Sequence, residues 1–380
     1  MQILSKLPQV EASIFSVMSG LARQHQAINL SQGFPNFDCD PVLKDLVNKY
    51  MQAGQNQYAP MAGVPALTAA LSEKINRLYQ VEYDAATEIT TTAGATQALS
   101  TAITALVRAG DEVIIVEPAY DSYQPFIELC GAKAVAYELA PPDWKIDWDQ
   151  FKRLITAKTK MILLNTPHNP SGVCLEADDF KQLAKLVEGT DIIILSDEVY
   201  EHMVFDGKRH QSILEHEGLR SRSLATYSFG KTLHATGWKL GYIVGDAKLM
   251  QEFRKVHQFN VFSVNTPMQY AVAEYLEVAE RYESLSPFFE QKRNLFLDLI
   301  KDSRFKIIPS QGTYFQLLDY SQISSEDDVT FAKRMTIEKG IALIPVSVFY
   351  QTKQQHQVVR ACFAKTDETL REAAVLLNKI

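Results

Sequence analysis

Short apolar runs alternate with amphipathic segments through the middle of the chain. The apolar runs have the length of buried strands and cover residues 88–92, 112–116, 133–137, 160–164, 192–196, 224–228 and 240–245. Helical spacing of apolar residues appears between several of them, over 97–109 and 176–187. Strands that are apolar throughout and separated by helices are typical of a mostly parallel sheet covered on both faces. We therefore predict an α/β fold.

The pattern changes on both sides of this region. Residues 1 to about 30 predict a helical arm, because Ile14, Phe15, Met18 and Leu21 recur at helical spacing, and two further helices are predicted over 41–52 and 64–79. Beyond residue 265, we predict a mostly helical segment over 278–300, paired strands over 305–309 and 314–318, a helix over 330–340, and strands over 341–345 and 358–363.

These elements suggest three units. Residues 1–30 form an arm that contributes to the small domain, residues 31–265 form a large domain, and residues 266–380 form a smaller C-terminal α/β domain. A chain of 380 residues is too long for one ordinary core, which favours this division.

Composition narrows the classes of function. The net charge is −7 and no basic run is present, so we expect no nucleic-acid partner. The longest apolar runs, such as 161–164 and 192–195, are far shorter than a membrane span, and residues 1–6 lack the layout of a signal peptide. We therefore expect a cytoplasmic protein without membrane contact. The four cysteines are scattered and predict neither disulfides nor a metal site.

Polar residues follow several predicted strands directly. They are Tyr120, Asn169, Asp197, Tyr200 and Lys231. Ligands of open α/β sheets bind beyond the carboxyl ends of the strands, so these residues form a candidate site. Each alone is as readily explained by packing, since a tyrosine near proline is often core and an asparagine before proline often marks a turn.

The segment 228–241 carries the most specific chemistry. Lys231 lies among small residues, with Ser228 three positions before it and Lys239 eight after. A lysine acts as a nucleophile when its amine is unprotonated, and it can form a Schiff base with an aldehyde cofactor. The hydroxyl and the second cation are suited to a phosphate group on that cofactor.

A second phosphate-binding feature is predicted at residues 93–96. A strand, a turn of small residues and a helix start follow one another there, which directs free backbone N–H groups and the helix dipole to one point. The turn matches neither the dinucleotide nor the P-loop pattern. Small residues at such a turn also serve close helix packing, so this signal alone leaves both explanations open.

Taken together, the motifs resemble the fold-type I, class I pyridoxal-phosphate-dependent aminotransferases, and within them the kynurenine, glutamine and methionine aminotransferases. The motifs that carry the resemblance are segments 31–35, 56–58, 165–170, 196–200, 228–241, 255–258, 311–315 and 359–360. Segments 60–63 and 262–267 are most similar to those of bacterial methionine aminotransferases. The resemblance implies a seven-stranded sheet in the large domain and a homodimer with shared active sites.

The resemblance also implies the role of each site residue. Lys231 binds pyridoxal 5′-phosphate covalently, Asp197 pairs with the ring nitrogen, Asn169 and Tyr200 bind the ring oxygen, and Tyr120 stacks on the ring. The phosphate is bound by Ala95, Thr96, Ser228 and Lys239, with Tyr58 reaching across from the other subunit. Arg360 binds the substrate carboxylate, and Gly33 leaves room beside it.

Two positions depart from the family pattern. Lys239 stands where the broad class usually has arginine, so a forked phosphate contact becomes a point charge. His234 stands where a small or aliphatic residue is usual, and the sequence offers no physical reason for it.

The resemblance implies ping-pong transfer of an α-amino group from an amino acid to a 2-oxo acid. Residues Ile14, Phe15, Tyr58, Met61, Tyr120 and Phe262 suggest an apolar pocket, which favours methionine as donor, followed by aromatic amino acids, glutamine and kynurenine. One alternative is a carbon–sulfur β-lyase that acts on cysteine S-conjugates with the same lysine. The other is a non-catalytic module that senses the cofactor, although an intact lysine and the absence of a basic patch speak against it.

Overall fold

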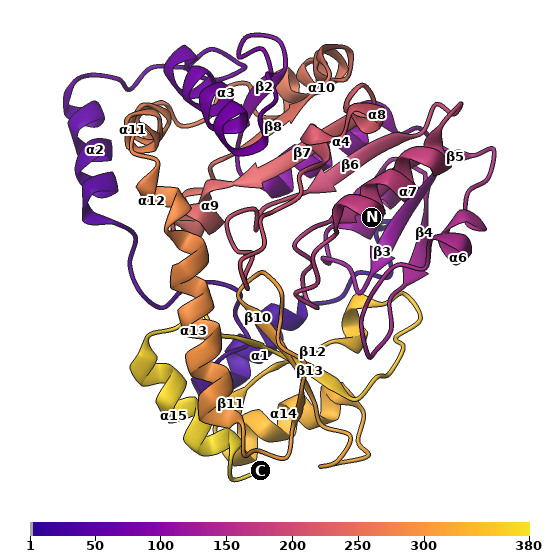
Figure 1. Ribbon diagram of the computed structural model, residues 1–380, viewed down its shortest axis with the longest axis vertical. Coiled ribbons are helices and arrows are strands. Elements are labelled where there is room, and N and C mark those ends of the chain that lie inside the picture. Colours follow the sequence, from indigo (N-terminus) through magenta and orange to yellow (C-terminus); the bar gives the residue numbers. More distant parts are fainter. Residues whose placement is uncertain (1–2) are drawn as a thin grey trace.

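The computed structural model describes residues 3–380, and Figure 1 shows an upper part built on a large sheet and a lower part built on a small one. The large sheet has the strand order β2-β8-β7-β6-β5-β3-β4. Its strands are β2 (Ile89–Thr92), β3 (Glu112–Glu117), β4 (Lys133–Glu138), β5 (Thr159–Asn165), β6 (Ile193–Asp197), β7 (Ser223–Ser228) and β8 (Gly241–Gly245). Only β8 runs antiparallel to its neighbours. The predicted α/β fold with a mostly parallel, seven-stranded sheet is confirmed.

Alternate residues of the central strands belong to different hydrophobic clusters. Ile162 and Leu164 of β5 pack in one cluster, whereas Met161 and Leu163 pack in the other. Because side chains alternate between the faces of a strand, each cluster lies on its own face of the sheet. The sheet is therefore buried on both faces, which explains why its strands are apolar throughout.

Helices on each face contribute to these clusters. One face is covered by α4 (Ala95–Leu106), α5 (Tyr123–Leu129) and α10 (Ala247–Asn260). The other is covered by α3 (Pro65–Tyr79), α7 (Ala177–Val187) and α8 (Glu217–Arg220). Shorter or peripheral helices are α2 (Pro41–Gln52), α6 (Trp148–Lys152), α9 (Phe229–Thr232) and α11 (Thr266–Leu276). Of these, α11 packs against α2 and α3.

The lower part holds a four-stranded sheet in the order β12-β13-β10-β9. Its strands are β9 (Lys306–Ile307), β10 (Phe315–Asp319), β12 (Ile344–Pro345) and β13 (Val358–Cys362). Around it lie α13 (Leu285–Ile300), α14 (Asp328–Lys339) and α15 (Asp367–Leu377), whereas the short helix α12 (Glu280–Glu283) lies in the upper part and contacts α11. In Figure 1, α13 runs down from the upper part into the lower one.

The N-terminal arm packs on this lower part. Its helix α1 (Ile14–Gln24) contacts α14, and β1 (Ile28–Asn29) pairs in parallel with β11 (Ile341–Ala342). The strand predicted over 341–345 is wrong as one element, because its first half pairs with β1 while Ile344 and Pro345 pair with β13. The domain boundaries at residues 30 and 265 stay a prediction.

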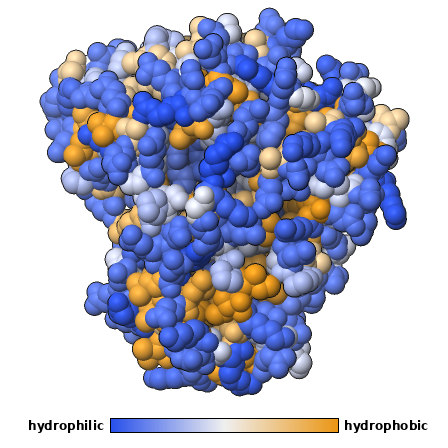
Figure 2. Space-filling model, in the orientation of Figure 1, coloured by the Kyte–Doolittle hydropathy of each residue, from blue (hydrophilic) through white to orange (hydrophobic). Residues whose placement is uncertain are grey.

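Most side chains on the face shown in Figure 2 are hydrophilic, and hydrophobic ones gather mainly over the lower part. Within residues 3–380, no helix has both the length and the apolar character needed to cross a membrane.

Candidate active site

A cavity of about 240 Å³ lies beyond the carboxyl ends of β5, β6 and β7 and reaches the lower part. It is lined by every residue predicted to bind the cofactor or the substrate carboxylate except Tyr58, namely Gly33, Ala95, Thr96, Tyr120, Asn169, Asp197, Tyr200, Ser228, Lys231, Lys239 and Arg360. Of the other residues predicted to form an apolar substrate pocket, Phe15 lines the cavity and Ile14, Met61 and Phe262 do not. Because parallel strands end at one edge of the sheet, residues far apart in the sequence meet here. Arg360 comes from β13 of the lower part, so both parts of the chain form the cavity.

Asp197 ends β6 and is only 4% exposed. The Tyr123 hydroxyl donates to its Oδ2 at 2.6 Å, and the Val199 N–H donates to Oδ1 at 3.4 Å. Burial raises the pKa of the Asp197 carboxyl to about 6, despite these donors. Among residues 3–380, no cation lies within 4 Å of it. A buried carboxylate of this kind is suited to a cationic ligand.

Lys231 lies in α9, just after β7. Its Nζ donates to the Gly33 carbonyl at 3.2 Å and lies 5.7 Å from the centre of the Tyr200 ring. Burial lowers the pKa of the Lys231 amine to about 8. At pH 7 roughly a tenth of the amine is therefore neutral, far more than for an ordinary lysine, and the neutral form is what a nucleophile or a general base requires.

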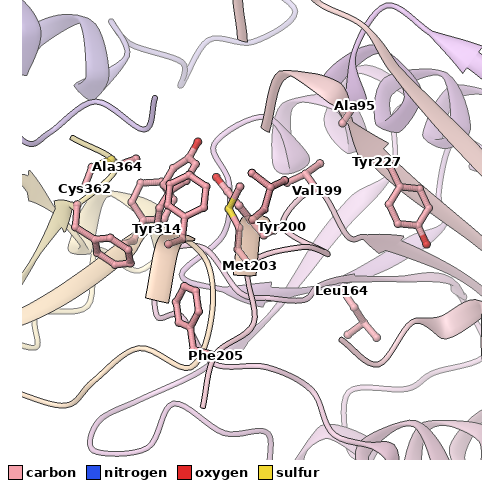
Figure 3. Close-up of a cluster of buried hydrophobic side chains, with 14 of the residues drawn as sticks. Ala95, Leu164, Val199, Tyr200, Met203, Phe205, Tyr227, Tyr314, Cys362 and Ala364 are labelled. Carbon is pink, nitrogen blue, oxygen red and sulfur yellow. The ribbon is translucent and has the colours of Figure 1, made fainter. Parts of the chain in front are cut away.

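Tyr200 joins the two parts of the chain at this point. Its ring lies 5.2 Å, centroid to centroid, from the ring of Tyr314, which precedes β10 (Figure 3). Burial raises the pKa of the Tyr200 hydroxyl, so that it remains a hydrogen-bond donor at neutral pH. Tyr314 in turn donates to the Gly33 carbonyl at 2.6 Å.

Arg360 is 1% exposed, yet no carboxylate within residues 3–380 forms an ion pair with it. Its guanidinium donates to Asn169 Oδ1 at 2.8 Å and to the Ser31 carbonyl at 3.0 Å, and it lies 3.9 Å from the centre of the Phe315 ring. Its Nε has no partner. A buried guanidinium that is bonded only to neutral acceptors can bind an anion from solution.

The opposite end of the cavity is suited to a phosphate. The helix α4 begins at Ala95 and its N-cap, Gly94, has φ +78° and provides no side-chain cap. The amides of its first turn, which includes Thr96, are therefore available to an anion. A Cβ atom at Gly94 would lie 3.5 Å from Lys239 Nζ, which places this ammonium group beside the helix start.

Tyr58 lies outside the cavity. Its side chain is 82% exposed and packs edge-to-face on Phe262, with ring centroids 5.3 Å apart. A single chain does not bring Tyr58 to the other predicted phosphate ligands.

Three lining residues that carry no predicted role make close contacts with the predicted site residues. Tyr123 bonds to Asp197, Asn165 Nδ2 donates to the Asp197 carbonyl at 2.8 Å, and Phe315 packs on Arg360. Asn165 could have been predicted as a site residue, because it ends β5 and lies shortly before Asn169 in the sequence. The only signal for Tyr123 was its position shortly after Tyr120, at the start of α5.

The structure explains His234. Its ring packs edge-on against Phe37 at 5.2 Å and Phe289 at 5.5 Å, within an aromatic cluster that also includes Phe288. Burial lowers the pKa of His234 to about 4, so the ring is neutral and behaves as an aromatic packing residue.

Comparisons with known proteins give a consistent result. Residues 25–377 match the family described as aminotransferase class I and II. The chain is 49% identical to methionine aminotransferase of Escherichia coli K12, over 99% of this chain and 98% of that protein. It is 32% identical to human kynurenine–oxoglutarate transaminase 3, over 98% of this chain and 89% of that protein. The crystal structure of YbdL from Escherichia coli, identified as having a methionine aminotransferase function, superposes with a TM-score of 0.98, 48% identity and full coverage of both chains.

Proposed function

The chain belongs to the class I and II aminotransferase family, and from that premise we propose that it transfers the α-amino group of methionine to a 2-oxo acid with the aid of pyridoxal 5′-phosphate. Aminotransferase activity follows from membership of the family. The donor, the bound cofactor, the site roles and the dimer are part of the proposal.

The residues of the cavity fit the cofactor at each of its functional groups. The observation that carries the proposal is the pair formed by a buried carboxylate without a cation, Asp197, and a half-buried lysine with a lowered pKa, Lys231. The ring nitrogen would pair with Asp197 and the aldehyde carbon with Lys231. The amides of Ala95 and Thr96 and the Ser228 and Lys239 side chains would bind the phosphate. When bound, pyridoxal 5′-phosphate supplies an electron sink for the substrate α-carbon.

The protein's own residues then have distinct tasks. Arg360 binds the substrate carboxylate and exchanges its bond to the Ser31 carbonyl for two parallel bonds to the ligand. Lys231, once free, would remove the proton from the substrate α-carbon and deliver it to the carbon that came from the cofactor's aldehyde group, because its lowered pKa allows it to act first as a base and then as an acid. Asn169 and Tyr200 would donate to the ring oxygen, and Tyr120 would stack on the ring. Gly33 keeps the space beside Arg360 clear, since a Cβ atom there would lie 2.9 Å from the Phe315 ring and 4.0 Å from the Arg360 guanidinium.

Two observations support methionine as the donor. The first is the 49% identity to the methionine aminotransferase of Escherichia coli. The second is the lining of the cavity, whose charged residues, Asp197, Lys231, Lys239 and Arg360, all have another proposed task. The remaining lining includes Phe15, Phe34 and Phe315, which suits an apolar or thioether side chain.

A homodimer and a cytoplasmic location are part of the proposal. Tyr58, Phe259 and Phe262 are 82%, 86% and 48% exposed, and a second copy that covers these aromatic side chains would also bring Tyr58 to the phosphate end of its partner's cavity. All four cysteines are free thiols, which a reducing compartment maintains.

A donor panel tests the proposed activity. The purified protein is incubated with a 2-oxo acid and, in turn, methionine, phenylalanine, glutamine, kynurenine or aspartate, and the new amino and 2-oxo acids are measured by chromatography. We expect methionine to give the highest kcat/KM and aspartate the lowest, and Lys231→Ala to abolish all transfer. Release of pyruvate and a thiol from an S-substituted cysteine, without transfer from any donor, would instead identify a β-lyase.

A further inference from the structure

The turn after β6 carries acidic residues that do not line the cavity. Asp197 and Tyr200 face the cavity, whereas Glu198 and Glu201 are 0% and 6% exposed and contact other elements. Two buried carboxylates on one short turn are costly unless they are fully bonded. Their partners therefore show what holds the turn in place.

Glu201 is bonded to helix α3 and strand β8. Lys74 Nζ donates to its Oε1 at 2.6 Å, the Tyr242 hydroxyl donates to the same oxygen at 3.0 Å, and the Tyr79 hydroxyl donates to Oε2 at 2.7 Å. The side chains of Lys74 and Glu201 are 2% and 3% exposed. Burial alone would raise the pKa of Glu201, but Lys74 holds it at about 2, so the carboxylate is ionised.

Glu198 accepts from four donors, three of which come from other segments. Its Oε1 accepts from the Ser196 hydroxyl at 2.9 Å and the Ile213 N–H at 2.9 Å. Its Oε2 lies 2.8 Å from the donating Tyr227 hydroxyl and 2.9 Å from His210 Nε2. Four partners satisfy a carboxylate, so Glu198 is fixed without a lysine or an arginine.

The two glutamates are connected to the strands that lead to Lys231. Tyr227 on β7 pairs in register with Tyr242 on β8, and their rings stack with centroids 4.7 Å apart. Tyr227 directly precedes Ser228, and Lys231 follows in α9. The turn that carries Asp197 and Tyr200 is thus bonded to the strand that positions Lys231.

We propose that Lys74 and Glu201 are positioning residues whose ion pair fixes the Tyr200 hydroxyl relative to Lys231. Glu201 follows Tyr200 directly, so the three bonds that hold its carboxylate also restrain the Tyr200 backbone. A buried ion pair is often no more stabilising than a well-packed apolar pair, whereas it does define one geometry. The inference rests on the proposed function, because Tyr200 is taken to donate to the ring oxygen of the cofactor.

The expected signature is a shift in a titration. A donor to the ring oxygen of the cofactor stabilises the negative charge on that oxygen. It therefore lowers the pKa of the proton that the oxygen shares with the Lys231 nitrogen. If Tyr200 moves away, the absorbance of the bound cofactor should change at higher pH. We expect a rise of the midpoint by about one pH unit in Glu201→Gln and in Lys74→Met, in the same direction as in Tyr200→Phe.

Matched variants separate positioning from folding. The double variant Lys74→Met/Glu201→Gln replaces the pair by neutral side chains and keeps an acceptor for the Tyr79 and Tyr242 hydroxyls, so it should regain resistance to urea while its midpoint stays raised. Tyr79→Phe removes one neutral donor to Glu201 and should give a smaller rise. The control variants Lys181→Met and Asp178→Asn break an exposed ion pair of 2.7 Å and should leave both the midpoint and the urea resistance unchanged.

The holoenzyme is titrated from pH 5 to pH 10 by absorbance, and each variant is also unfolded in urea without cofactor. Variants that bind the cofactor and retain the parent midpoint would overturn the positioning role and leave the proposed function intact. A parent protein that shows no cofactor absorbance would overturn the proposed function, and this inference with it. A raised midpoint in the double variant together with restored stability supports the inference.

Discussion

Asp197 illustrates a conflict between stability and function. The folded carboxyl has a pKa of about 6 against an ordinary value of 3.8, so the folded state holds a proton that the unfolded state loses. Stability therefore falls as the pH rises from about 3.8 to 6 and remains lower above that window. A cationic ligand that binds to the ionised carboxylate would restore the stability that is lost above this pH window.

Replacing Asp197 should remove the loss of stability that its ionised carboxylate causes at neutral pH. In the cofactor-free protein at pH 7, we expect Asp197→Asn to raise the free energy of unfolding by up to about 3 kcal/mol, while turnover falls by about a hundredfold or more. Urea unfolding at pH 4 and pH 7 provides the measurement, and the two proteins should differ little at pH 4. An unchanged or lower stability of the variant at pH 7 would contradict this account of the carboxylate.

Lys231 should differ from a surface lysine in its reactivity. Its pKa of about 8 means that the amine of the cofactor-free protein gains its acylation reactivity around pH 8. The ammonium form dominates below that value and is unreactive. Peptide mass spectrometry after brief acylation over a pH series measures the pH midpoint of acylation for each lysine. Lys208 is the reference, because it is exposed and Glu176 raises its pKa. Equal midpoints for the two lysines would show that burial does not activate Lys231.

Much of the candidate site could be predicted from single residues in the sequence. Asp197, Ser228 and Lys231 could be found because a polar residue after a continuous apolar strand must end at the edge of the sheet. Tyr123 could not, since its bond to Asp197 depends on how α5 packs and the sequence contains many tyrosines. The roles of all these residues stay predictions.

At the scale of elements, the close approach of β8 to the start of α4 forms the phosphate end of the cavity. A Cβ atom at Gly241 would lie 2.5 Å from the Tyr227 carbonyl oxygen and 3.0 Å from the Gly94 carbonyl carbon. Both neighbours are backbone atoms, so they can give way only if β8 or the helix start moves. Gly241 is therefore required by the contact between these elements.

We expect Gly241→Ala to lower the affinity for pyridoxal 5′-phosphate by about tenfold or more, because it displaces the amides of α4 from Lys239. Equilibrium titration followed by absorbance measures this affinity. The matched control is Gly20→Ala in α1, where an added Cβ meets nothing within 4 Å. Unchanged affinity in Gly241→Ala would indicate that the phosphate is bound elsewhere.

Helices and strands could be predicted where a single pattern of apolar residues matches the way the element is buried. The strands of the large sheet begin and end within one residue of the predicted positions, because each is buried on both faces. The division of residues 341–345 into two strands could not be predicted. Its apolar residues pair with two different sheets, and periodicity does not show where a short buried run divides. The early start of α4 at Ala95 was also missed, because Gly94 gives no side-chain capping signal.

At the scale of the whole molecule, the cavity lies where the two parts of the chain meet, and the proposal adds a second copy that supplies Tyr58. Mixed dimers can test the shared site. Tyr58→Ala and Lys231→Ala should each have low activity, and unfolding and refolding them together should restore activity, since one site of each mixed dimer contains both native residues. The unmixed variants, treated in the same way, are the controls, and no recovery in a mixture that forms dimers would contradict the shared site.

The central claim is that this protein removes the amino group of methionine with pyridoxal 5′-phosphate bound at Lys231. The most direct measurement is a stopped-flow absorbance scan of the purified holoenzyme mixed with methionine alone, without any 2-oxo acid. We predict that the cofactor band of the resting protein disappears, that the band of pyridoxamine phosphate appears, and that one equivalent of 2-oxo acid is released per site. An absent cofactor band, or a band that methionine leaves unchanged, would contradict the account.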